Sequence, residues 1–68
     1  MMVKIRINGE ERELESGITV LGMVESLGLD LDKIAVEKNR EIVSRSTFCD
    51  AAICDGDQIE IIQFVGGG

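Results

Sequence analysis

Residues 55–65 read DGDQIEIIQFV, and this stretch decides the fold. Its first three residues, Asp55–Asp57, have the composition of a tight turn, because Asp and Gly tolerate the backbone conformations that turns require. The run from Gln58 to Val65 that follows is mostly apolar, which is typical of a strand buried on both faces. We therefore predict that this run is the central strand of a sheet.

Two β-hairpins are predicted elsewhere in the chain. Asn8 and Gly9 follow a run in which apolar and polar residues alternate, and this pair tolerates the positive φ values of a type I′ turn. Asn39 and Arg40 lie in a polar stretch between two short β-prone runs, which predicts a second hairpin around this pair. The predicted strands of the two hairpins cover residues 3–8, 11–15, 34–36 and 42–43.

One helix is predicted between the hairpins. Apolar residues recur at helical spacing from Val20 to Leu27, Thr19 suits the N-cap, and Gly28 suits a left-handed C-terminal stop. The internal Gly22 either permits close packing or weakens the helix by about 1 kcal/mol relative to Ala. Residues 46–54 are interpreted as a connection with one helical turn. The order β-β-α-β-β-turn-β predicts an α+β fold, a mixed sheet of about five strands packed on one main helix.

The size and charge of the chain limit the classes of protein to which it can belong. Its 68 residues suffice for one small domain, which we place at residues 1–65. With 7 basic and 13 acidic residues the net charge is -6, which disfavours binding to nucleic acid or to an anionic membrane. No apolar run approaches the ~20 residues of a membrane span or resembles a secretory signal, so we expect a cytoplasmic protein.

The residue types also argue against an enzyme. The chain has no His, Trp or Tyr, so the usual residues for imidazole general-base catalysis and for aromatic base stacking are missing. Cys49 and Cys54 are too few for a disulfide framework. With no cationic run beside them to activate a thiol, we interpret both as small buried or half-buried side chains rather than persulfide carriers. We therefore expect a protein that is not by itself an enzyme.

Three glycines, Gly66–Gly68, follow the predicted central strand. Glycine contributes no side chain to a core, so we expect a flexible tail. One interpretation is a disordered end or a cloning remnant without function. The other is that a strip without side chains, reaching about 10 Å at ~3.3–3.6 Å per residue, threads a narrow channel and presents its terminal carboxylate to a partner's active site.

Several segments together resemble the ThiS family of sulfur carrier proteins in thiamine biosynthesis. Each segment is common by itself, but their order in a short chain that closes on glycines is specific. The matching segments are 5–10, 19–20, 35–39, 42–43, 55–61 and 64–68. The chain departs from the family pattern at Gly22-Met23, where an acidic residue and Leu are usual, and in having three final glycines where two suffice. The resemblance implies a β-grasp, or ubiquitin-like, fold.

The resemblance also implies a chemistry centred on Gly68. In the family, an E1-like adenylyltransferase of the ThiF type uses ATP and Mg²⁺ to convert the C-terminal carboxylate into an acyl-adenylate. Sulfur from a persulfide, supplied by a donor such as a cysteine desulfurase, then gives a thiocarboxylate, and thiazole synthase of the ThiG type takes the sulfur. By this resemblance Gly66 and Gly67 enter the partner's channel, and the carrier holds no permanent cofactor and is a monomer when free.

Three alternatives stay open from the residues. The small subunit of molybdopterin synthase would share the mechanism, although residues 35–39 and 64–68 look more like the thiamine branch. In a ubiquitin-like protein modifier, a lysine amine would capture the activated Gly68. A non-covalent β-grasp binding module would leave the tail idle. Phe64 and Val65, which precede the tail, belong either to a surface that docks a partner or to the core.

Overall fold

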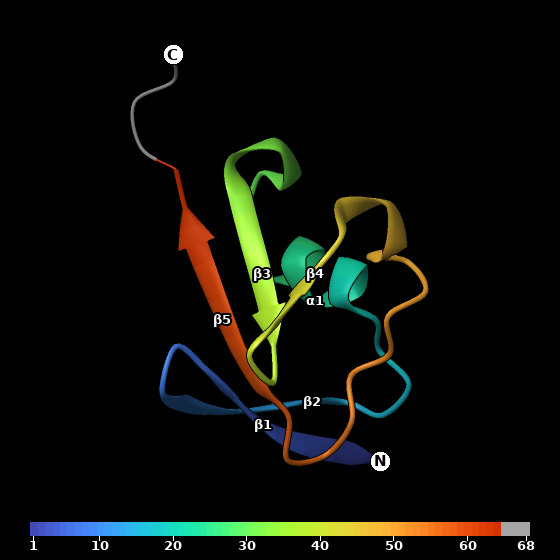
Figure 1. Cartoon of the computed structure of the whole chain (residues 1–68). Helices are drawn as coiled ribbons and strands as arrows, with labels where there is room; N and C mark the ends of the chain where they lie inside the picture. Colours follow the sequence, from blue (N-terminus) through green and yellow to red (C-terminus); the bar gives the residue numbers. More distant parts are fainter. Residues whose placement is uncertain (65–68) are drawn as a thin grey trace.

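The computed structural model describes residues 1–64. Val65 and the predicted tail, Gly66–Gly68, lie outside the described residues. The described part contains five strands, one α-helix and two short 3₁₀ helices (Figure 1). In chain order the elements are β1 (Met2–Ile7), β2 (Glu10–Glu15), α1 (Val20–Ser26), η1 (Leu31–Lys33), β3 (Ile34–Lys38), β4 (Glu41–Val43), η2 (Arg45–Thr47) and β5 (Gln58–Gln63).

One mixed sheet holds all five strands in the order β2-β1-β5-β3-β4. β5 runs parallel to β1 and antiparallel to β3. The prediction that the strand after Asp57 is central is therefore confirmed. In Figure 1, β5 crosses the molecule and ends on the side opposite to the N-terminus. The α+β fold with five strands and one main helix matches the predicted β-grasp architecture.

Both hairpins turn through left-handed backbone. Asn8 and Gly9 have φ values of 51° and 83°, and Asn39 and Arg40 have φ values of 52° and 71°. Two consecutive positive φ values are the mark of a type I′ turn, whose twist matches that of the flanking strands. Both hairpins thus form at the predicted pairs, and each has an asparagine at the first turn position.

The ends of α1 lie where the capping residues predict them. The Oγ1 atom of Thr19 accepts a hydrogen bond from the Gly22 N–H over 3.2 Å. Gly28, with φ 71°, ends the helix through left-handed backbone. A Cβ atom at Gly22 would lie 2.9 Å from Cγ1 of Ile18, which favours the interpretation that this glycine permits close packing. None of the helices within residues 1–64 is long and apolar enough to cross a membrane.

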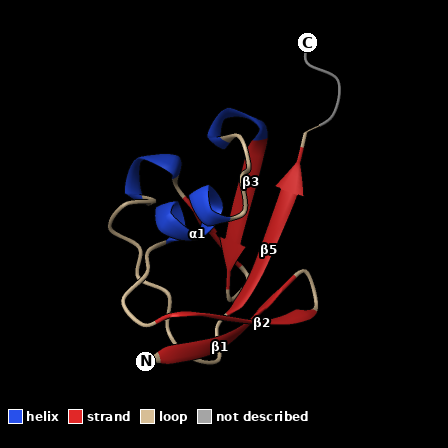
Figure 2. Cartoon of the chain, turned by 180° about the vertical axis from the view of Figure 1, so that it is seen from behind, coloured by secondary structure: helices blue, strands red, loops and turns tan. Residues whose placement is uncertain are grey.

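The core lies between the sheet and α1, which covers one face of the sheet (Figure 2). Ten buried apolar side chains form it: Ile5, Ile7, Val20, Met23, Val24, Ile34, Val36, Phe48, Ile53 and Ile59. The prediction that the central strand is buried on both faces is wrong. Ile59 faces the core and is 1% exposed, whereas Ile62 on the open face is 46% exposed. A single layer of helix leaves alternate side chains of β5 in solvent.

The interpretation of the two cysteines as buried or half-buried is also wrong. Cys49 and Cys54 are both exposed. They lie in the connection between η2 and β5, where Phe48 and Ile53 occupy the core positions. This connection contains little regular secondary structure. Its two large apolar side chains, Phe48 and Ile53, point into the core, and the neighbouring thiols point to solvent.

Candidate functional site

The candidate site is the end of β5, because this strand leads directly to the glycines. The N–H of Phe64 donates to the carbonyl of Lys33 over 2.8 Å. This bond continues the β3–β5 ladder one residue past the end of β5, beyond the pair formed by Ile34 and Gln63. The last described residue is therefore held in the sheet from the β3 side.

On the other side of β5, the side chain of Asn8 replaces a strand. β1 leaves β5 after Ile7, and the N–H of Asn8 donates to the carbonyl of Ile59 over 2.9 Å. The Asn8 side-chain amide then accepts from the Ile61 N–H at Oδ1, over 2.8 Å, and donates from Nδ2 to the Ile61 carbonyl, over 3.1 Å. The amide thus satisfies both backbone groups of Ile61, as a paired strand residue would.

Asn39 has a matching role at the start of β5. Its backbone N–H donates to the Gln58 carbonyl over 2.7 Å, and its Oδ1 accepts from the Gln58 N–H over 2.9 Å. Its Nδ2 donates to Oδ1 of Asp57 over 3.0 Å. The other carboxylate oxygen of Asp57, a buried side chain, accepts from the Cys54 N–H over 2.8 Å. The two hairpin turns therefore hold the central strand near both of its ends.

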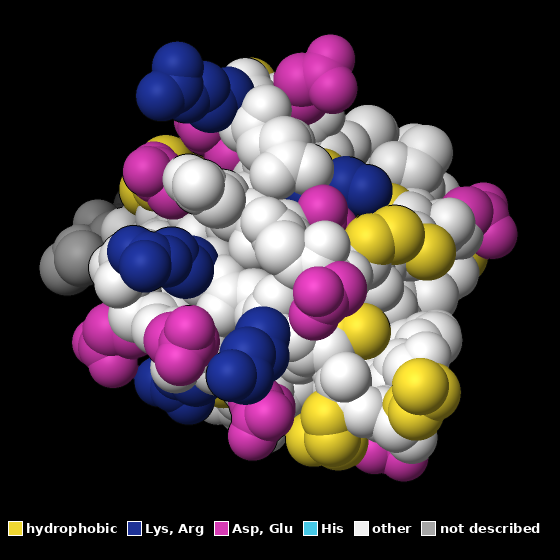
Figure 3. Space-filling view, turned by 90° about the horizontal axis from the view of Figure 1, so that it is seen from below, with side chains coloured by type: hydrophobic (Ala, Val, Ile, Leu, Met, Phe, Trp, Pro, Cys, Tyr) yellow, Lys and Arg dark blue, Asp and Glu magenta, His cyan; other side chains and the backbone are white. Residues whose placement is uncertain are grey.

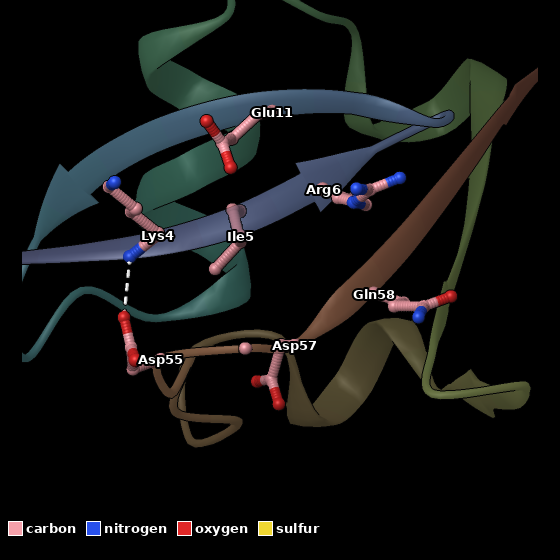
Figure 4. Close-up of a pocket in the computed structure, with 8 residues that line it drawn as sticks. Lys4, Ile5, Arg6, Glu11, Asp55, Asp57 and Gln58 are labelled. Atoms are coloured by element: carbon pink, nitrogen blue, oxygen red, sulfur yellow. Dashed lines mark hydrogen bonds between the residues drawn. The ribbon is translucent and has the colours of Figure 1, made fainter.

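The turn before β5 is also tied to β1 (Figure 4). The Lys4 N–H donates to Oδ1 of Asp55 over 2.7 Å, and the Gly56 N–H donates to the Lys4 carbonyl over 2.7 Å. A groove of about 200 Å³ lies at this junction, with Lys4, Glu11 and Asp55 among its lining residues. Positively and negatively charged side chains line this groove. The backbone hydrogen bonds at the junction anchor the turn to β1.

Apolar side chains lie exposed beside the end of β5. Phe64 is 57% exposed and Ile62 is 46% exposed. Alternation along a strand places both side chains on the face away from α1, and Ala35 lies opposite Ile62 on β3. We call Ala35, Ile62 and Phe64 the open-face patch. Of the two residues predicted for docking or core, Phe64 is thus exposed, and Val65 lies outside the described residues.

The remaining surface shows no concentration of one charge on the face drawn in Figure 3, where Lys and Arg side chains lie among Asp and Glu side chains. Within residues 1–64, no three Cys, Asp or Glu side chains come together as a metal site. Of the predicted site residues, Gly66, Gly67 and Gly68 lie outside the described residues, so the structure places only the strand that precedes them. Sequence reasoning identified Asn8 and Asn39 as turn formers but missed their contacts with β5.

Comparison with known proteins agrees with this architecture. The family model described as "ThiS family" matches residues 5–68. The sulfur carrier protein ThiS of Bacillus subtilis is 32% identical over 65 residues, which cover 94% of this chain and 98% of the relative. The crystal structure of the thiamine biosynthesis protein ThiS from Geobacter metallireducens superimposes with a TM-score of 0.84 at 26% identity, covering 97% of this chain and all of the other.

A second kind of relative is much longer. A thiazole synthase of Paramagnetospirillum magneticum is 47% identical over 66 residues, which cover 97% of this chain but only 20% of the enzyme. The chain therefore spans about a fifth of the length of this relative. Both the family match and the near-complete coverage of the Bacillus subtilis protein lead to the same assignment. The chain belongs to the ThiS family of sulfur carrier proteins in thiamine biosynthesis.

Proposed function

We propose that this carrier works through the carboxylate of Gly68, which an E1-like adenylyltransferase activates and a persulfide converts into a thiocarboxylate. The observation that carries the proposal is the family match, which runs through Gly68 and so includes the final glycines. A terminal carboxylate is ionised at neutral pH and is a poor electrophile, so it must be activated. Because glycine has no side chain, neither the phosphate nor the sulfur nucleophile meets a steric obstacle at the carbonyl.

The proposed reaction has three steps. An oxygen of the Gly68 carboxylate attacks the α-phosphorus of ATP, held with Mg²⁺ by the activating enzyme, and pyrophosphate leaves. The terminal sulfur of a protein persulfide, drawn from cysteine by a donor such as a cysteine desulfurase, attacks the carbonyl carbon of the adenylate, and AMP leaves. A thiol then cleaves the S–S bond of the resulting acyl disulfide, which releases the thiocarboxylate and leaves a disulfide on the thiol side.

The open-face patch supports docking of the activating enzyme beside the tail. Phe64 and Ile62 expose apolar surface next to the last described residue, and the Phe64 backbone is held by Lys33. Exposed aromatic side chains that are fixed in place are typical anchors of protein interfaces. We also propose Val65, which follows Phe64 in the sequence, as a residue that contacts the activating enzyme.

We further propose that the sulfur goes to thiazole synthase. The support is the relative of that name, a fifth of whose length resembles this whole chain. A protein that carries the matching region within one chain keeps carrier and enzyme at a high effective concentration. In the present case we propose that the two meet in the cytoplasm, that the carrier holds no permanent cofactor, and that it is a monomer when free.

Adenylation by the activating enzyme tests the proposal directly. The chain ending at Gly68 is compared with the same chain carrying a C-terminal amide, and ATP–pyrophosphate exchange is measured with each. The amide lacks the oxygen nucleophile, so exchange is lost while circular dichroism shows an unchanged domain. Undiminished exchange with the amidated chain would refute the role of the Gly68 carboxylate.

Intact mass spectrometry separates the remaining alternatives. After incubation with activating enzyme, ATP and a persulfide donor, the carrier gains the mass difference between sulfur and oxygen. A product crosslinked to a lysine would identify a protein modifier, and an unchanged mass would identify a non-covalent binding module.

A further inference from the structure

One edge of β5 is open just before the glycines. In the antiparallel β3–β5 ladder, residues whose backbone groups point to β3 alternate with residues whose groups point away. Phe64 donates to Lys33 and so points to β3, which means that the N–H and carbonyl of Gln63 point to the β1 side. Asn8 satisfies Ile61 on that side, but no residue in the described range 1–64 pairs with the backbone of Gln63.

A groove of about 220 Å³ lies next to this open edge. Its walls come from the β1–β2 hairpin and from the chain after α1, and β5 lies between them. It is lined by Ile7, Asn8, Arg12, Leu27, Leu29, Ile61 and Gln63. A cavity of about 150 Å³ accommodates a benzene ring, so this groove has room for one aliphatic or aromatic side chain.

Arg12 is the one cation among the residues that line the groove. Its Cα lies opposite Ile5 in the β1–β2 ladder, so its side chain is on the α1 side of the sheet. Within residues 1–64 it takes part in no ion pair, whereas Arg45 pairs with Asp32. An arginine in a groove that is lined partly by apolar side chains favours a carboxylate as its partner.

From these features we infer that the open edge of β5 and this groove bind an extended segment of thiazole synthase. The segment adds a strand beside β5, pairs with the backbone of Gln63, places one apolar side chain in the groove and brings a carboxylate to Arg12. The inference rests on the proposed transfer of sulfur to thiazole synthase, and it identifies the surface by which that enzyme holds the carrier.

Thiazole synthase is the occupant that the observations favour. The groove borders Gln63, which directly precedes the last described residue, Phe64. The open-face patch, which we assign to the activating enzyme, lies on the other face of the sheet. A thiazole synthase also carries a region 47% identical to this chain, so in that relative a similar region is joined to the rest of the enzyme.

The two outer edges of the sheet suit strand addition less well. β2 has four glutamates among its six residues, and such charges discourage pairing with another chain. β4 has only three residues and offers a short ladder. The edge at Gln63 is different, because a groove lined partly by apolar side chains lies next to the open backbone groups.

Binding to purified thiazole synthase, measured by titration calorimetry without ATP, tests the inference. We expect Arg12→Glu to raise the dissociation constant by roughly tenfold, because a rim ion pair is replaced by repulsion. Arg40→Glu is the matched control, since it changes the net charge equally at an exposed turn that does not line the groove, and it should leave the constant within about twofold. Because no adenylation is needed, a failure of the Gly68 chemistry would be seen separately, as absent ATP–pyrophosphate exchange.

Amide hydrogen exchange tests the strand pairing itself. The Gln63 N–H should exchange at least about tenfold more slowly in the complex than in the free carrier, because pairing protects it. Gln63→Pro removes this donor without removing a β3–β5 hydrogen bond, and it should weaken binding while circular dichroism confirms the fold. Unchanged exchange at Gln63 in the complex, or unchanged affinity of Arg12→Glu, would overturn the inference. Weaker binding of Arg12→Glu to the activating enzyme alone would overturn the choice of occupant.

Discussion

Replacing Asn39 by Gly tests how strongly a hairpin asparagine holds the central strand. The Asn39 side chain donates to Asp57 over 3.0 Å and accepts from the Gln58 N–H over 2.9 Å. Glycine adopts the φ of 52° found at this position without strain. The substitution therefore removes two hydrogen bonds and leaves the turn able to form.

The expected loss is a large part of the stability of the domain. A hydrogen bond to a charged group contributes about 1.5–3 kcal/mol and a neutral one about 1 kcal/mol, so the free energy of unfolding should fall by about 3 kcal/mol. At about 0.05–0.15 kcal/mol per residue, a domain of this size has roughly 3–10 kcal/mol in total. At roughly 4–8 °C per kcal/mol, the midpoint of thermal unfolding should fall by about 12–24 °C.

Asn8→Gly is the matched control, because Asn8 has a φ of 51° and makes two side-chain hydrogen bonds to the backbone of Ile61. Both are neutral, so we expect a loss of about 2 kcal/mol. Urea unfolding followed by circular dichroism measures both variants, alone and combined with Asp57→Ala. Asn39→Gly should couple to Asp57→Ala by about 1–2 kcal/mol, whereas Asn8→Gly should add to it within about 0.5 kcal/mol. Equal losses from the two glycine variants, together with additivity between Asn39 and Asp57, would refute the reasoning.

Three further predictions concern the site. Deleting Gly68 should reduce ATP–pyrophosphate exchange less than deleting Gly67 and Gly68 together, since a Gly-Gly end remains and the reach shortens by at most ~3.6 Å; equal reductions would count against this account of the tail. The double variant Cys49→Ser and Cys54→Ser should lose less than about 0.5 kcal/mol of stability, because both thiols are exposed, and should still accept sulfur by intact mass. A folded double variant that accepts none would reassign the persulfide to a cysteine. Phe64→Ala should raise the KM of the carrier in the exchange assay about tenfold, whereas Ile42→Ala, two strands from β5, should change it less than about twofold; an unchanged KM for Phe64→Ala would place docking elsewhere.

Local signals in the sequence were sufficient to predict the elements. Asn8-Gly9 and Asn39-Arg40 were identified as turns, and Thr19 and Gly28 as the ends of the helix, and the structure has each of them in that role. These signals work because a turn or cap depends on the conformational preferences and side-chain oxygens of a few neighbouring residues. The short helix η1 was not predicted, since the side chain of its cap, Asp30, bonds only to the N–H of Asp32, within a segment of weak pattern.

Whether a residue is buried depends on which other parts of the protein pack over it. The sequence alone was not sufficient to predict this. The run 58–65 was interpreted as buried on both faces because it is mostly apolar, yet Ile62 and Phe64 lie on the uncovered face. The pattern of apolar residues in a sequence does not distinguish a side chain that contacts a partner from one that packs in the core. The same limit applies to Asn8 and Asn39, whose bonds to β5 join residues 53 and 19 positions apart.

The hydrogen bonding of β5 changes at Gln63. Up to Ile61 the strand is bonded on both sides, by β3 and by the β1 hairpin with its Asn8 side chain. From Gln63 on, the bonds of the described residues come from the β3 side alone. An enzyme that takes up the end of the chain can therefore add its own backbone at Gln63 without displacing any bond of the core. In the proposed cycle, each exchange of partner would therefore leave the hydrogen bonds of Asn8 and Asn39 to β5 intact.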